Sequence, residues 1–160
     1  MNDPETLLER LIQAEVEFVI VGGYAALAHG CTLLTQDLDV CCRFTSDNLL
    51  KVQAALKDLH PWHRMTPNRI PLALTEESCR GLKNLYLDTD WGVLDCLSEI
   101  TGLGNHDEVL RESMEIQLPF GSCRLLSRGA LIRSKKAMGR PRDLEAVRQL
   151  QYIDRKDSNP

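Results

Sequence analysis

The chain has 160 residues, of which 43% are hydrophobic and 26% charged, and its formal net charge is −4. This length fits one compact domain, and the acidic balance argues against a general nucleic-acid-binding protein, which is usually basic. We expect residues 1–152 to form a single domain, and residues 153–160, which are polar and lack periodic apolar positions, to form a flexible tail.

The N-terminal sequence lacks the basic and apolar segments of a signal peptide, and no apolar run is long enough to span a bilayer. The six cysteines include no CxxC pair, and several lie inside apolar runs, as buried reduced thiols do. We therefore expect a cytoplasmic protein with no membrane partner. A zinc site built from Cys79 with His60 or His63 is a minor alternative, because that spacing matches no common zinc pattern.

The first part of the chain alternates between helix and strand signals. Asp3-Pro4-Glu5 is a strong helix start that precedes a stripe of apolar residues. Residues 17–21 form an apolar, β-branched run that predicts a buried strand ending at Gly22-Gly23. A short helix is expected over residues 24–29, closed by Gly30.

The rest of the chain continues this pattern. We expect a strand over 37–42, an amphipathic helix over 46–59, a loop over 61–71, and strands over 83–88 and 93–97 joined by a tight turn. Next come a short helix over 106–112 and strands over 114–118 and 122–126. The last two helices are predicted from Ser127 to about Met138, where Gly139 ends the first of them, and over 143–151.

The order of strand, Gly-Gly and helix is a geometry that binds phosphate. Glycine lets the backbone approach a ligand closely, and the first amides of a helix have no partner within the helix. On its own, Gly22-Gly23 after a strand is more often a simple turn. A phosphate site at this turn needs support from other residues.

Three aspartates supply that support. Asp37 and Asp39 flank Leu38, so both carboxylates point to one side of a strand, where they repel each other unless a cation such as Mg²⁺ lies between them. Asp95 is the only charged residue in the apolar run 93–97, and a buried carboxylate is costly unless it is paired or metal-bound. Taken singly, each of these features also fits a solvated strand face or an edge strand.

The ordered combination resembles the nucleotidyltransferase superfamily with the DNA-polymerase-β-like core. That family has a hydrophobic residue, Gly, then Gly or Ser, and later Asp-hydrophobic-Asp, here Val21-Gly22-Gly23 and Asp37-Leu38-Asp39, with the third carboxylate at Asp95. The resemblance is closest to the small bacterial AbiEii-like and lincosamide-nucleotidyltransferase-like group. It rests on Ala25-Ala26, His29-Gly30, Thr35 and the stretch from Leu131 to Val147.

This resemblance implies an α+β fold, with a small mixed sheet, helices on one face and C-terminal helices that close the cleft. It implies that Gly22 and Gly23 hold a nucleoside triphosphate, and that Asp37, Asp39 and Asp95 are catalytic residues that ligate Mg²⁺ or Mn²⁺. Lys135 and Arg140 are further candidates for the triphosphate. They belong to a basic run between Arg124 and Arg142, which a solvated helix end also explains.

The implied activity is transfer of a nucleoside monophosphate to a hydroxyl of a protein, a tRNA or a small molecule, with release of pyrophosphate. Relatives commonly carry Arg where this chain has Leu33. The alternative is therefore a weak or inactive member of the fold that acts as a binding partner, for instance in a toxin–antitoxin pair. A haloacid-dehalogenase-like phosphatase is disfavoured because its aspartates end a strand, and a DxD glycosyltransferase needs a larger domain.

Overall fold

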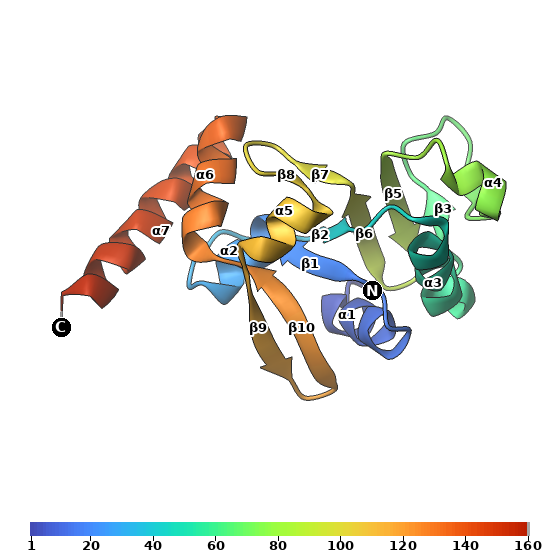
Figure 1. Cartoon of the computed structure of the whole chain (residues 1–160), viewed down its shortest axis with the longest axis horizontal. Helices are drawn as coiled ribbons and strands as arrows, with labels where there is room; N and C mark the ends of the chain where they lie inside the picture. Colours follow the sequence, from blue (N-terminus) through green and yellow to red (C-terminus); the bar gives the residue numbers. More distant parts are fainter. Residues whose placement is uncertain (160) are drawn as a thin grey trace.

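The computed structural model describes residues 1–159 and contains helices at both ends of the chain and a central sheet (Figure 1). The helices are α1 Pro4–Gln13, α2 Gly22–Ala28, α3 Ser46–Leu56, α4 Glu76–Cys79, α5 His106–Arg111, α6 Arg128–Met138 and α7 Pro141–Ser158. The strands are β1 Phe18–Val21, β2 Leu38–Cys42, β3 Trp62–His63, β4 Ile70–Pro71, β5 Asn84–Thr89, β6 Gly92–Leu97, β7 Glu99–Ile100, β8 Gly104–Asn105, β9 Ser113–Leu118 and β10 Gly121–Leu126.

The main sheet has 8 strands in the order β4-β3-β5-β6-β2-β1-β10-β9, and β7 pairs with β8 separately. Strand β2 pairs antiparallel with β1 and parallel with β6, and β1 pairs parallel with β10. The other pairs of the sheet are antiparallel. The predicted α+β fold with a mixed sheet is therefore confirmed, and β1, β2 and β6 lie at its centre.

Helix α1 forms where the sequence predicts it. The Asp3 side chain accepts a hydrogen bond from the Thr6 amide at 3.1 Å, which caps the helix, and Pro4 takes the first helical position. Leu7 and Leu11 are fully buried against the sheet. The cap therefore fixes where the apolar stripe of α1 begins, and the sheet stabilises the helix through that stripe.

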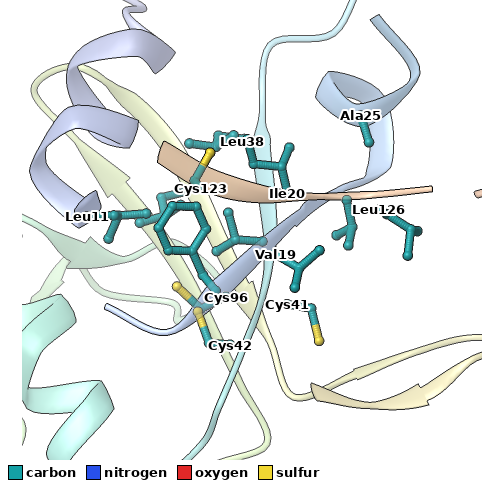
Figure 2. Close-up of a cluster of buried hydrophobic side chains, with 14 of the residues drawn as sticks. Leu11, Val19, Ile20, Ala25, Leu38, Cys41, Cys42, Cys96, Cys123 and Leu126 are labelled. Carbon is teal, nitrogen blue, oxygen red and sulfur yellow. The ribbon is translucent and has the colours of Figure 1, made fainter. Parts of the chain in front are cut away.

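Helices cover both faces of the central strands, whereas the prediction placed them on one face. All four residues of β1 are buried, although successive side chains of a strand point to opposite faces. On the face that carries Ile20 and Cys123, Leu11 of α1 packs in the core (Figure 2). Val19 and Leu126 are also buried, and α5 contacts the strands that carry them. Burial of both faces follows from the fully apolar sequence of β1.

Several short elements differ from the prediction. Strands β3 and β4 lie within the predicted loop 61–71, and α4, β7 and β8 were not expected. Two-residue strands carry too little alternation to be recognised in a sequence, because their pairing partners define them. Helix α2 begins at Gly22 instead of after the glycine pair, since its first turn uses both glycines.

The last helix extends beyond its predicted end. We expected it to stop near Gln151 and a flexible tail to follow, but α7 continues to Ser158. Arg128 of α6 donates to Asp154 at 3.0 Å and to Asp157 at 2.7 Å, and no Gly or Pro interrupts the stretch 152–158. These ion pairs hold the added turns of α7 against α6. Within residues 1–159, none of the helices is both long and apolar enough to cross a membrane.

The buried face of α1 gives a stability prediction. Leu11→Ala removes a fully buried side chain, and we expect it to lower the free energy of unfolding by about 2–5 kcal/mol in urea titrations. Leu34 is 87% exposed, so Leu34→Ala is the matched control, with an expected change within about 0.5 kcal/mol. Equal losses for the two variants would contradict the packing of α1 on the sheet.

Candidate functional site

The residues singled out in the N-terminal part of the sequence meet at one pocket. Its volume is about 360 Å³, within the range of roughly 300–1,000 Å³ typical of small-molecule sites. Helix α6 contacts both α2 and α7, so the C-terminal helices lie beside the glycine turn (Figure 1). The pocket is lined by the glycine pair, two of the predicted aspartates and three basic residues, namely Gly22, Gly23, Asp37, Asp39, Lys135, Arg140 and Arg142.

The glycine turn has steric reasons for its two glycines. Gly22 has a φ of +65°, a conformation that side chains disfavour, and a Cβ atom there would lie 2.5 Å from Oδ2 of Asp39. At Gly23 a Cβ atom would lie 2.5 Å from Oγ1 of Thr35. The glycines therefore let the β1–α2 backbone approach the segment that carries the aspartates.

Asp39 lies in an unfavourable environment for a carboxylate. Its neighbours in the sheet are Val21 of β1 and Asp95 of β6. Its pKa is raised to about 7, chiefly by loss of solvent and also by the charges of Asp95 and Asp37, while Lys135 and Arg64 partly oppose the rise. A half-buried carboxylate beside two others is a setting in which a divalent cation is stabilising.

Asp95 faces the same way as Asp39 and is held by an arginine that the sequence analysis did not identify. Arg64 Nε donates to Oδ1 of Asp95 at 3.1 Å, and Arg64 Nη2 donates to Oδ2. Asp95 is 6% exposed and does not contribute to the pocket wall. Burial raises the pKa of Asp95, and the hydrogen bonds and charge of Arg64 oppose that rise.

The cationic side of the pocket is organised by Asp143. Its Oδ2 accepts from Arg140 Nε at 2.6 Å, and its Oδ1 lies 3.8 Å from Lys135 Nζ. The same Oδ2 lies 3.3 Å from the Arg140 amide and caps α7, so Asp143 both pairs with Arg140 and caps the helix. Burial alone would raise the pKa of Asp143, but Arg140 and Lys135 outweigh it, and the pKa lies below its ordinary value.

Other residues named in the sequence have simpler roles. Leu33, where the resemblance stated above led us to expect Arg, lines the pocket with an apolar side chain. His29 ends α2, and its Nε2 lies 2.8 Å from the Leu126 carbonyl oxygen. Tyr24 is partly buried against the core. These contacts account for His29 and Tyr24 without a role in catalysis.

The carboxylates fit a divalent cation in part. Asp37 and Asp39 line the pocket together, and the pKa of Asp39 is raised by loss of solvent and by the neighbouring carboxylates more than Lys135 and Arg64 lower it. In residues 1–159, however, no group of three or more His, Cys, Asp or Glu side chains is arranged to hold a metal ion. This finding also gives the zinc alternative at Cys79 no support. Ligation of a metal ion by all three aspartates stays a prediction, because Arg64 holds both carboxylate oxygens of Asp95.

Comparison with known proteins identifies the fold. A crystal structure of ANT(2")-Ia in complex with adenylyl-2"-tobramycin matches with a TM-score of 0.57 and 13% sequence identity, over 94% of this chain and 90% of that chain. This likeness shows that the chain has a nucleotidyltransferase fold, as the sequence motifs predict. No protein-family model and no curated protein sequence matches the chain.

The glycine turn can be tested by substitution. We expect Gly22→Ala to lower the free energy of unfolding by at least about 1 kcal/mol, because alanine disfavours the positive φ and its Cβ would meet Asp39. Gly129 lies in α6 with open space around it, so Gly129→Ala is the control, with an expected gain of about 0.5–1 kcal/mol. A Gly22→Ala protein as stable as wild type would contradict the close approach.

The raised pKa of Asp39 predicts that this residue lowers the free energy of unfolding in a pH-dependent way. The folded state keeps a proton on Asp39 up to about pH 7, whereas an unperturbed aspartate loses it near 3.8. The folded state therefore binds more protons between these values, so Asp39 destabilises the fold increasingly as pH rises from about 4 to 7, and fully above 7. In metal-free buffer, we expect Asp39→Asn to raise the free energy of unfolding by about 1–3 kcal/mol at pH 8.

The gain in the free energy of unfolding caused by Asp39→Asn should shrink toward zero near pH 4, where Asp39 is largely protonated in the folded and the unfolded state. Urea titrations at the two pH values measure it, with the exposed Asp47→Asn as the control. A gain that is the same at pH 4 and pH 8 would show that the Asp39 charge is not its cause.

Proposed function

We propose that this protein is a metal-dependent nucleotidyltransferase that moves a nucleoside monophosphate from a nucleoside triphosphate to a hydroxyl acceptor and releases pyrophosphate. The observation that carries the proposal is the meeting of the glycine turn, Asp37 and Asp39 with basic residues at one pocket. Two further observations support it. The backbone at Gly22 approaches the Asp39 carboxylate closely, and Asp39 lies in an environment that raises its pKa, as a metal-ligating carboxylate does when no cation is beside it.

The chain supplies groups for the triphosphate and for a divalent metal ion. The backbone at Gly22 and Gly23 and the side chains of Lys135 and Arg140 bind the triphosphate, and Asp37 and Asp39 hold Mg²⁺ or Mn²⁺. Arg142 lines the same pocket and adds a cation that the sequence analysis did not single out. When bound, the divalent ion neutralises phosphate charge and stabilises the attacking and leaving oxygens.

Asp95 takes the role of general base. It accepts the proton of the acceptor hydroxyl as that oxygen bonds to the α-phosphorus, and the bond to the oxygen that bridges the α- and β-phosphorus breaks, so pyrophosphate leaves. The position of Asp95 beside Asp39 supports this role. The bond to Arg64 must first be released, because Arg64 holds both oxygens of Asp95.

The finer assignment rests on the sequence motifs. We place the chain in the small bacterial AbiEii-like and lincosamide-transferase-like group, in the cytoplasm, with a protein, a tRNA or a small molecule as acceptor. A catalytically weak form that binds a partner, as in a toxin–antitoxin pair, is the second candidate. Leu33 in the pocket wall favours that second candidate, because an apolar side chain there cannot bind phosphate.

Calorimetry with each of the four ribonucleoside triphosphates, with and without Mg²⁺ or Mn²⁺, tests the proposal. We expect metal-dependent binding to the wild type and at least a tenfold loss in Asp37→Asn/Asp39→Asn, since charge-assisted contacts to the ion contribute about 1.5–3 kcal/mol each. The charge-matched control is Asp47→Asn/Asp58→Asn, which changes two aspartates outside the pocket and should bind like wild type.

Binding of no nucleotide by folded wild type would contradict the enzyme and leave the partner-binding candidate. Binding that is equal in the wild type and in Asp37→Asn/Asp39→Asn would place the nucleotide elsewhere on the protein. Binding without turnover on any acceptor would favour the second candidate over the first.

A further inference from the structure

The pair of Arg64 and Asp95 sits at the centre of the proposed reaction. Arg64 uses two nitrogens of its guanidinium group on the two oxygens of one buried carboxylate. Such a bidentate pair is geometrically specific and strong. It occupies the edge of Asp95 that a metal ion or a hydroxyl proton would also need.

The two partners differ in how freely each can move. Asp95 is fixed on β6, between β2 and β5, with Asp39 and Tyr86 opposite it. Arg64 follows β3, where its amide donates to the Tyr86 carbonyl oxygen at 3.0 Å, and its guanidinium lies 5.4 Å from the centre of the Tyr86 ring. The Arg64 side chain is 26% exposed. The arginine can therefore turn toward solvent while its backbone and Asp95 stay in place.

The charges around the pair explain why an arginine is needed when no metal is bound. Asp39, which is half-buried, and Asp95, which is buried, are neighbours in the sheet, and two carboxylates so placed repel each other. Leaving a buried charge without a partner costs several kcal/mol. A guanidinium group that holds Asp95 removes that cost, and a divalent cation can take over the same task.

We propose that Arg64 is a positioning residue that withholds Asp95 from the metal site, and that Asp95 exchanges Arg64 for the divalent cation when metal and nucleotide together fill the pocket. This inference rests on the proposed function, because it assigns a partner change to the general base of that reaction. Asp95 keeps a positive partner throughout, first Arg64 and then the cation.

Titration of Mn²⁺ into the full chain at pH 8, followed by electron paramagnetic resonance, measures metal binding without turnover. The central variant is Arg64→Gln/Asp95→Asn, which removes one charge of each sign and keeps the net charge of wild type. Without nucleotide, we expect it to bind Mn²⁺ as wild type does, because Asp95 is withheld in one protein and absent from the other. Arg64→Gln alone frees Asp95 and should bind about tenfold more tightly, or about 1.4 kcal/mol.

The same titration with α,β-methylene analogues of the four ribonucleotides should separate the two proteins. In wild type Asp95 now joins the metal site, so Mn²⁺ should bind about tenfold more tightly than to Arg64→Gln/Asp95→Asn. Arg10→Gln is the matched control, because Arg10 makes a similar two-bond pair with Asp58 away from the pocket, at 2.6 and 3.0 Å. It should bind like wild type in both conditions. Thermal unfolding verifies that each variant is folded.

Two outcomes would overturn the inference, and with it the role of Asp95 as general base, while leaving nucleotide and metal binding at Asp37 and Asp39 standing. Equal Mn²⁺ affinity of wild type and Arg64→Gln/Asp95→Asn with the nucleotide analogue bound would show that the pair never opens and is structural. Tighter binding by wild type without nucleotide would show that Arg64 does not withhold Asp95. If wild type binds neither Mn²⁺ nor any analogue, the proposed function fails and this inference fails with it.

Discussion

The parallel pairing of β2 with β6 is the constraint on which the rest of the site depends. Its register sets Asp39 opposite Asp95, and the antiparallel register of β1 sets Val21 on the other side of Asp39. Gly22 follows directly, so the chain must turn within contact of the Asp39 carboxylate. A shift of one residue in β2 would turn Asp39 to the opposite face of the sheet, away from Asp95 and the glycine turn.

That register makes the site a source of instability that other residues must offset. Half-buried Asp39 and buried Asp95 lie side by side, and the pKa of each is raised chiefly by loss of solvent. Basic residues from distant parts of the chain offset the carboxylate charges, since Arg64 bonds Asp95 and the charge of Lys135 lowers the pKa of Asp39. Burial lowers the pKa of Lys135 as well, although the charge of Asp143 opposes this. The unfavourable groups lie where a charged substrate would bind, as is common in functional sites.

The sequence predicted the parts of the site that local patterns determine. The Gly-Gly pair after an apolar strand, two aspartates separated by one residue, and one charge within an apolar strand are all visible over a few residues. Arg64 was missed because it falls in a stretch that resembles a loop, and its role depends on β3 pairing with β5 beside β6. No local signal reports such a pairing. The end of α7 was missed for a related reason, since its last turns depend on ion pairs with Arg128 of α6.

Several charges of the site are paired within the chain. Asp95 is paired with Arg64, and Lys135 and Arg140 share Asp143, which is 2% exposed. A metal–nucleotide complex brings both signs of charge, a cation for the aspartates and phosphates for the basic side chains. Asp143 is bound to the Arg140 amide as the cap of α7, so it would hold Lys135 and Arg140 in place in the proposed complex with phosphate. Lys135 and Arg64 only partly offset the loss of solvent and the neighbouring carboxylates at Asp39, so in the proposed complex Asp39 is the group that a divalent cation would stabilise most.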